Sequence, residues 1–483
     1  MLTRFSVVPV LAIDQGTSGT KAIVVDGDGA ILGSAECPVR PVYRTGGSVE
    51  QDPAELLQSV VTAGREAIAA SGVDVDAVAL ANQGETVLAW DPASGRPLSA
   101  AVGWQDRRSE SVCDRLQEHG GLIAERTGLM LSAYFSAPKM AWLREHVTRK
   151  GVVTTSDSWL VWQLCGEFVT DVTTASRSLL LDIDTVTWDP GLLGIFGLDG
   201  ERLPRLVDCD EVVGSTSAFG HEIPVGGLIV DQQAALLAEG CIDAGRSKCT
   251  YGTGAFILAN TGPSAPRSTG GLTTSVASRT RSGTQYCIDG QVYTAASAVR
   301  WLADIGIISD ASDLDRLAAD SSGGTLFVPA LAGLAAPYWR ADATASLSGL
   351  SLATGRGELV RSVLEGIAAQ VAVLAGVVAS DLGGPLASLR VDGGLTRSAV
   401  LMQAQADLLQ VPVEVYASPD ATALGAAALA CMSLDTGRQL ADAPWPWEPA
   451  AVYEPRWEPD RAADFLSRWT AAIERGLDVE RGA

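Results

Sequence analysis

The chain carries one structural plan twice, and this repetition constrains its fold more than any other feature. In each half, apolar runs flank a glycine-containing turn, and helical periodicity follows. Strands that alternate with helices are typical of α/β proteins, whose parallel strands are buried. The first half predicts strands at 10–14, 20–26, 30–36 and 76–83 and a helix at 53–71. The second half predicts two strands within 247–262, further strands at 389–394 and 411–418, and helices at 357–380, 398–410 and 422–434.

The length sets the number of domains. A chain of 483 residues corresponds to two or three domains of about 100–200 residues each. The two halves meet near 240–247, so we expect a first domain at 1–245 and a second at 246–440. Residues 441–483 form a C-terminal segment. It contains the Pro- and Trp-rich stretch 443–459, interpreted as a packed surface strap, and it ends in a helix.

Charge and composition exclude several classes of protein. Lys and Arg number 35 and Asp and Glu 57, giving a formal net charge of −22. Such a balance argues against sequence-independent nucleic-acid binding, which needs a basic face. The three histidines, His119, His146 and His221, are far apart, and the eight cysteines form no CxxC pair. We therefore expect neither a histidine metal site nor a disulfide framework, and we place the chain in a reducing compartment.

No segment predicts a membrane span. The apolar run after Arg4 ends at Asp14 without a signal-peptide cleavage site. The apolar stretch 367–380 is too short to cross a bilayer and is interpreted as a buried core helix. We expect a soluble, cytoplasmic protein.

Three glycine turns have the character of phosphate-binding segments. They lie at 14–21, 250–256 and 391–403. Small residues let backbone N–H groups converge on an anion, and Asp14 beside the first turn suits Mg²⁺ bound through water. No Walker or Rossmann glycine motif is present. An ordinary hairpin is the alternative for any single turn, but the three together predict a nucleotide held between two lobes.

Asp231 is the candidate general base. It follows an apolar strand and opens a helix, so its carboxylate lies at a strand end, where ligand crevices form. The alternative is a helix N-cap, because Asp is a favoured cap. Gln232 beside it offers both a donor and an acceptor, as recognition of a hydroxyl group requires.

Aromatic and polar residues form two further clusters. Gln83 and Glu85 follow a strand, and Trp104 precedes Asp106 and two arginines. A Trp ring beside carboxylate and amide groups suits a polyhydroxylated carbon chain. The alternative places Trp104 in the core and the charges in surface ion pairs.

The ordered motifs resemble the FGGY carbohydrate kinases of the actin-like ATPase superfamily, and most of all the glycerol kinases among them. The similarity covers roughly residues 9–435. Its motifs, in family order, are DQGTSGTKAIVVD, DSWLVWQLCGEFVTDVTTASRSLLLDI, DQQAAL, YGTGAFILANTG, FVPALAGLAAPYW, VDGG, LMQAQADLL and TALGAAALA.

The resemblance implies two actin-like (ribonuclease H-like) ATPase domains of α/β class that close over ATP-Mg²⁺ and a small polyol in an interdomain cleft. It implies that Asp231 is the catalytic base and that Asp14 organises Mg²⁺. It implies that the polyol is bound by Glu85, Trp104, Tyr134, Asp231, Gln232 and Phe256. It implies that the nucleotide is bound by Thr17, Ser18, Lys21, Gly252, Thr253, Ala296, Arg300, Gly394 and Ser398. A homodimer or homotetramer is expected.

Several positions depart from the family pattern. Gly84 stands where glycerol kinases usually have an arginine that hydrogen-bonds glycerol. The loss of that arginine is expected to leave room for a longer substrate. Lys21 replaces a common arginine, and Ala296, Arg300 and Ser398 replace the more usual Gly, Gln and Asn. Phosphorylation of glycerol to glycerol 3-phosphate is the first hypothesis. The alternatives are a kinase for a C4–C5 polyol or ketose (erythritol, xylitol, xylulose or ribulose) and a catalytically inactive sugar sensor.

Overall fold

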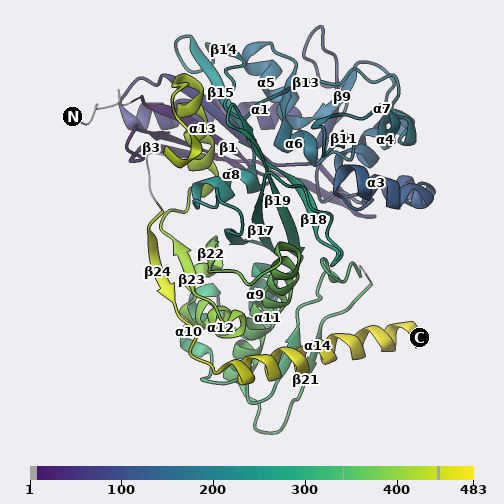
Figure 1. The fold of residues 1–483 in the computed structure, drawn as a ribbon, viewed down its shortest axis with the longest axis vertical. Helices are drawn as coiled ribbons and strands as arrows, with labels where there is room; N and C mark the ends of the chain where they lie inside the picture. The colour runs from purple at the N-terminus through teal and green to yellow at the C-terminus, as the bar shows by residue number, and fades with distance from the viewer. Residues whose placement is uncertain (1–7, 341, 443–446, 483) are drawn as a thin grey trace.

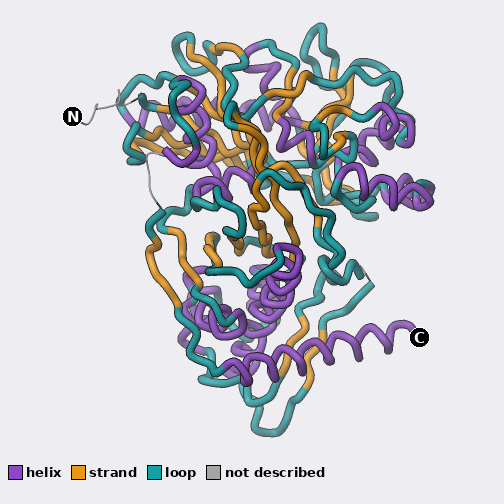
Figure 2. Tube along the Cα trace, in the orientation of Figure 1, coloured by secondary structure: helices purple, strands orange, loops and turns teal. Residues whose placement is uncertain are grey.

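The two halves of the sequence fold into two lobes, each built on one mixed β-sheet (Figure 1). The computed structural model describes residues 8–340, 342–442 and 447–482. Long strands cross the middle of the molecule, and helices cover both lobes (Figure 2).

The first sheet has the strand order β14–β15–β6–β1–β2–β3. Its three central strands, β15, β6 and β1, are parallel, and the outer pairs are antiparallel. The strands are β1 (Val10–Gln15), β2 (Gly19–Val25), β3 (Ile31–Pro38), β6 (Ala77–Asn82), β14 (Gly214–Thr216) and β15 (Ile223–Val230).

The second sheet repeats this arrangement, with the order β18–β19–β17–β16–β22–β23–β24. β16, β22 and β23 are parallel, and antiparallel strands flank them. The strands are β16 (Ser247–Tyr251), β17 (Ala255–Gly262), β18 (Thr273–Thr280), β19 (Gly283–Val292), β22 (Leu389–Asp392), β23 (Val413–Tyr416) and β24 (Pro449–Tyr453). The repeated plan read from the sequence is confirmed. The strands on either side of each short glycine turn are antiparallel, because a tight turn cannot join parallel strands.

Helices cover both faces of the first sheet. Leu11 and Ile13 of β1 face helix α1 (Pro53–Ser71), which begins at the N-cap Asp52. Val10 and Ala12 face the opposite side. There the sheet packs against α8 (Asp231–Ala238) and α13 (Ala421–Leu434).

Helix α13 belongs to the second half of the sequence but packs in the first lobe. Its small side chains allow a close approach to α8. A Cβ atom at Gly425 would overlap the carbonyl oxygen of Ala234. The chain therefore returns to the first lobe after most of the second lobe is built.

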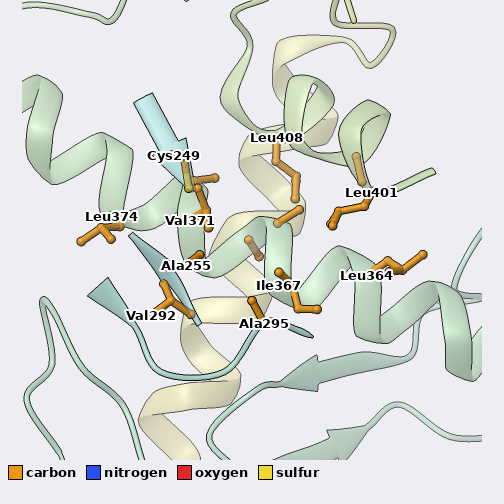
Figure 3. Packing of buried hydrophobic residues seen from close by; sticks show 14 of the residues in the cluster. Cys249, Ala255, Val292, Ala295, Leu364, Ile367, Val371, Leu374, Leu401 and Leu408 are labelled. Carbon is orange, nitrogen blue, oxygen red and sulfur yellow. The ribbon is translucent and has the colours of Figure 1, made fainter. Parts of the chain in front are cut away.

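The second lobe is built around α11 (Arg356–Leu382). Leu364, Ile367 and Val371 of this helix pack against strands β16, β17 and β19 and helix α12 (Ala399–Leu409) (Figure 3). The helix extends well beyond the apolar stretch 367–380. Within the described residues it is the one helix long and apolar enough to cross a membrane, but 78% of its apolar window is buried. It is a core helix, as the sequence predicts.

The stretch interpreted as a surface strap differs from the prediction in part. Residues 443–446 lie outside the described residues, and 449–453 form β24, which pairs antiparallel with β23 at the sheet edge. An edge strand tolerates Pro449 at its first residue because Pro need not donate to the ladder there. The predicted terminal helix is α14 (Pro459–Gly482).

The remaining elements surround the two sheets. A third sheet has the order β4–β5–β8–β7–β9. Its strands are β4 (Val42–Arg44), β5 (Ser48–Gln51), β7 (Val87–Trp90), β8 (Ala101–Val102) and β9 (Val152–Thr155). The small two-stranded sheets pair β10 (Val169–Asp171) with β13 (Arg205–Val207), β11 (Leu181–Asp182) with β12 (Thr187–Trp188), and β20 (Leu326–Val328) with β21 (Ser346–Ser348).

The other α-helices are α2 (Glu110–Arg115), α3 (Gly120–Thr127), α4 (Ser136–His146), α5 (Ser156–Cys165), α6 (Val172–Ser176), α7 (Pro190–Ile195), α9 (Ala296–Asp304) and α10 (Leu314–Leu317). Short 3₁₀ turns are η1 (Gln117–His119), η2 (Ala311–Asp313), η3 (Gly394–Arg397) and η4 (Leu440–Asp442).

Candidate active site

A cavity between the two lobes gathers most of the residues predicted to bind substrate. It is lined by Glu85, Tyr134, Arg177, Val230, Asp231, Gln232, Gln233, Phe256, Leu258 and Asp289. Five of these were predicted from the sequence: Glu85, Tyr134, Asp231, Gln232 and Phe256. Trp104 stands behind them, with its ring 5.7 Å from the ring of Tyr134 and 6.4 Å from that of Phe256. The cavity therefore combines a wall of aromatic rings with a set of charged and amide groups.

Asp231 is the first residue of α8 and follows the buried end of β15. Val230 occupies the N-cap position and makes no side-chain cap bond, so the N-cap interpretation of Asp231 is wrong. The Oδ1 atom of Asp231 accepts the N–H of Gln232 at 2.7 Å. Burial, followed by the charge of Glu85, raises the pKa of Asp231 to about 6. This carboxylate is a stronger base than an ordinary Asp side chain.

Arg177 joins two carboxylates of the cavity. Its Nε atom forms an ion pair with Glu85, and its Nη1 atom lies 3.0 Å from Oδ1 of Asp289. All three residues are buried. Burial raises the pKa of Glu85, and the charge of Arg177 opposes that shift. The guanidinium also lies 5.7 Å from the ring of Tyr134. Arg177 thus holds the polar wall of the cavity in place before any ligand binds.

Lys139 fixes the loop that carries Tyr134. Its Nζ atom is buried and donates to the backbone carbonyls of Ala133, Tyr134 and Phe135 at 2.9, 2.5 and 2.8 Å. Burial lowers the pKa of Lys139 to about 7. The position of Tyr134 is therefore set by a lysine outside the cavity lining.

The first glycine turn connects to the aromatic wall. The N–H of Gly16 donates to the carbonyl of Gly19 at 2.9 Å, closing the turn between β1 and β2. The indole Nε1 of Trp104 donates to Oγ1 of Thr17 at 2.8 Å. Ser18 is exposed at the tip of the turn. One hydrogen bond therefore links the predicted polyol wall to the predicted phosphate turn.

Asp14 is the penultimate residue of β1, close to this turn. Lys21 forms an ion pair with Asp420, which precedes α13. Burial, followed by the charge of Asp231, raises the pKa of Asp14 to about 7. In the described part of the chain no cluster of three or more His, Cys, Asp or Glu side chains forms a ready metal cage. Mg²⁺ does not need one, because it binds through one or two carboxylates, water and substrate phosphates. The crowded negative charge at Asp14 fits such a cation.

The second glycine turn joins β16 to β17 and lies next to the start of α9. The carbonyls of Gly252 and Thr253 accept N–H groups of Ala296 and Ala295, both at 3.0 Å. A Cβ atom at Gly254 would overlap the carbonyl oxygen of Val292, so the turn requires glycine there. The predicted residues Gly252, Thr253 and Ala296 therefore lie together. Arg300 is exposed further along α9.

The third glycine turn joins β22 to α12. Gly393 has a φ of +96°, and Gly394 opens a short 3₁₀ turn. Among the described residues, no atom would lie within 4 Å of a Cβ atom added at Gly394. Ser398 is buried and caps α12 by accepting the N–H of Leu401 at 3.2 Å. Its hydroxyl donates to Asp315 at 2.5 Å. Gly394 therefore leaves space for a ligand, whereas the Ser398 hydroxyl already serves two partners.

Comparison with known proteins decides the family. Residues 9–238 match the N-terminal domain, and residues 247–434 the C-terminal domain, of the FGGY family of carbohydrate kinases. The protein belongs to this family. It is 42% identical to a glycerol kinase of Aromatoleum aromaticum, over 96% of this chain and 98% of that one. It is 43% identical to a glycerol kinase of Gloeobacter violaceus, over 86% of each chain.

Solved structures of FGGY kinases share the fold. A glycerol kinase of Plasmodium falciparum with ADP superposes with a TM-score of 0.91 at 33% identity, covering 98% of this chain and 99% of that one. A structure described as a xyloylose kinase from Brucella ovis superposes with a TM-score of 0.86 at 26% identity, with 98% of both chains covered. The predicted two-domain actin-like fold is therefore confirmed. The protein is a glycerol kinase-like FGGY carbohydrate kinase that uses ATP.

Gly84 lies beside a residue of the cavity wall. A Cβ atom at this position would lie 3.0 Å from Cγ2 of Val230, which itself lines the cavity. A valine methyl group therefore lies next to the first atom of the missing side chain, and the room expected for a longer substrate stays a prediction. The position that carries an arginine in typical glycerol kinases faces an apolar group in this FGGY kinase.

Sequence reasoning missed Arg177, Asp289 and Lys139. Arg177 lies within a segment that resembles the family, but a single arginine in a sequence is usually a surface residue. Its burial follows from partners 92 and 112 residues away. One signal in the sequence could have identified Arg177. It is the single basic residue in 172–183, a segment made mostly of small or apolar residues.

Proposed function

We propose that this kinase transfers the γ-phosphoryl group of ATP to the terminal hydroxyl of a small polyol, with glycerol as the first substrate. The observation that supports this most is Asp231, a carboxylate with a raised pKa in a cavity that also holds paired charges and aromatic rings. Aromatic rings accept the C–H faces of a polyol, and the carboxylates accept its hydroxyl protons.

In the proposed reaction Asp231 accepts the proton of the attacking hydroxyl. The hydroxyl oxygen forms a bond to the γ-phosphorus, and the bond from that phosphorus to the bridging oxygen breaks, so ADP leaves. Proton transfer to a carboxylate with a pKa of about 6 occurs late, as the alcohol oxygen bonds to phosphorus. Positioning of the two reactants contributes most of the rate.

Mg²⁺ bound near Asp14 would neutralise phosphate charge during transfer. Thr17, Ser18 and Lys21 are proposed to approach the phosphates from the first lobe. Support comes from the location of Asp14 and its crowded charge beside the first turn. Lys21 would exchange its partner Asp420 for a phosphate oxygen.

On the second lobe, the proposed nucleotide contacts are Gly252, Thr253, Ala296, Arg300, Gly394 and Ser398. The first three are supported by their common location at the start of α9. Gly394 is supported by the open space around it. Ser398 would contact nucleotide only through its backbone, because its hydroxyl is engaged.

Two further properties remain proposals. Cytoplasmic location is supported by the buried state of the apolar helix α11 and by free thiols at all eight cysteines. A homodimer or homotetramer is proposed, and light scattering of the purified protein measures it.

A coupled assay of ADP release over C3, C4 and C5 polyols and ketoses tests the proposed function. Glycerol should give the highest kcat/KM, because relatives 42% and 40% identical over 96% of this chain are glycerol kinases. A higher value for erythritol or xylulose would establish the longer-substrate alternative. Polyol binding without turnover of any substrate would establish the sensor alternative.

A further inference from the structure

A buried lysine lies directly behind the cavity. Lys248 on β16 is fully buried, with 0% of its surface exposed. Its Nζ atom donates to Oε1 of Gln232 at 2.9 Å and to Oγ1 of Thr250 at 2.6 Å. Gln232 in turn lines the cavity. Lys248 belongs to the second lobe and Gln232 to the first, so this contact crosses between the lobes.

The chemistry of an ammonium group fixes the orientation of the amide. A lysine Nζ has three donors and no acceptor, whereas a Gln amide offers either an oxygen or an NH₂ group. Gln232 must therefore turn its oxygen toward Lys248, and its NH₂ group points away from the lysine. An unrestrained Gln side chain would present either end to a ligand.

We propose that Lys248 is a positioning residue that makes Gln232 a pure hydrogen-bond donor toward the acceptor substrate. The inference rests on the proposed function. It assigns the direction of one hydrogen bond in that site, from the NH₂ group of Gln232 to the substrate. Glu85 and Asp231 offer acceptors to the same ligand. A hydroxyl oxygen that donates its proton to a carboxylate can accept from Gln232 at the same time, so the set suits adjacent hydroxyl groups.

A purely structural role for Lys248 is the competing explanation. Two carboxyl groups of the same region, the buried Glu239 and the half-buried Asp392, have oxygen atoms without a hydrogen-bond partner among the described residues. Burial raises the pKa of Glu239, and the charge of Lys248 opposes that rise. If Lys248 only balanced these charges, its loss would not act through Gln232.

A double-mutant cycle separates the two roles. The variants are Lys248→Met, Gln232→Ala and the double variant, with KM for glycerol and kcat measured at pH 8.5, well above the pKa of Asp231 in the wild type. Each single variant should raise KM by about 3- to 10-fold, with a smaller change in kcat, because the contact is present in ground and transition state alike. The KM of the double variant should be no higher than that of Gln232→Ala.

Two further variants serve as an independent test and as a control. Gln232→Glu keeps an oxygen for Lys248 and replaces only the NH₂ group, so it should raise KM at least as much as Gln232→Ala. It leaves the lysine in place and therefore keeps the inference testable if Lys248→Met does not fold. Ser247→Ala is the matched control, because it removes a buried hydrogen bond of the same strand to the carbonyl of Ser388. It should leave KM unchanged.

Two outcomes would overturn the inference: KM effects of Lys248→Met and Gln232→Ala that multiply in the double variant, or a wild-type KM in Gln232→Glu. Failure of the proposed function is a separate result, since it would appear as absence of turnover in the wild type. In that case the same cycle is measured on the dissociation constant for glycerol by calorimetry, with the same criteria.

Discussion

The two sides of the interlobe cleft are built in different ways. On the first lobe, the cavity is lined by buried charged side chains, and Arg177 is held between Glu85 of the same lobe and Asp289 on β19 of the second lobe. On the second lobe, the glycine turns are defined by backbone, and their side chains are small or absent. From this difference we propose that acceptor recognition depends on a few preorganised charges. For the nucleotide, we propose that recognition depends on where the backbone can approach.

The largest expected effect comes from removing the base on the charged side. Asp231→Asn should lower kcat by about 10²–10⁴-fold, because the hydroxyl proton loses its acceptor. The dissociation constant for ATP, measured by calorimetry, should stay within a few-fold of the wild type, since the proposed nucleotide contacts lie elsewhere. A near-normal kcat would remove Asp231 from its proposed role.

The charge network should also dominate stability. Arg177→Met leaves Glu85 and Asp289 buried without their cation, and the free energy of unfolding should fall by about 3–5 kcal/mol. Urea denaturation measures this change. The matched control is Arg107→Met, which breaks an exposed pair with Glu110 and should cost at most about 1 kcal/mol. Equal losses in the two variants would mean that the buried network has no special importance.

On the backbone side, the sensitive positions should be glycines. Gly393 has a positive φ, and a Cβ atom there would overlap the carbonyl oxygen of Tyr251. Gly393→Ala should therefore lower the free energy of unfolding by about 1–3 kcal/mol and weaken nucleotide binding. Gly394→Ala has open space and should change the free energy of unfolding by no more than about 0.5 kcal/mol. Similar stability in the two variants would show that the turn is not held by backbone packing.

The smallest effect is a pH limb. Because Asp231 must be ionised to accept a proton, kcat/KM should be half its maximum near pH 6 and fall about tenfold per unit below that. The residual rate of Asp231→Asn should lack this limb.

Stability should change with pH in the opposite direction to the rate. The pKa of Asp231 in the folded state lies above the ordinary 3.8, so the contribution of this group to the free energy of unfolding falls as pH rises from about 4 through about 6. A flat rate profile between pH 5 and 7 would contradict the assignment.

Much of the fold could be predicted because it depends on local patterns. The helix at 53–71 carries its own start and stop signals, Asp52 with Pro53 and Gly72, and the structure has it at the predicted bounds. The edge strand β24 was missed because Pro and Trp dominate its neighbourhood and strand pairing there depends on β23. The placement of α13 in the first lobe could not be read from its sequence, since small apolar residues suit any tightly packed helix.

The same division holds for the site. Asp231 and Glu85 were predictable because each follows a strand end, where crevices form. Their neighbours Arg177 and Lys248 were not, because burial and partners arise only when distant segments meet. The effect of Gly84 on substrate length stays a prediction for the same reason. The sequence shows the missing side chain but not that a methyl group of Val230 lies beside it.

The return of α13 to the first lobe means that the polypeptide cannot be cut into two self-sufficient pieces. A fragment ending at residue 245 would lack this helix, and Val10, Ala12 and Ala234 would be left facing water. Such a fragment should aggregate when produced alone and recover only when its complement is synthesised beside it.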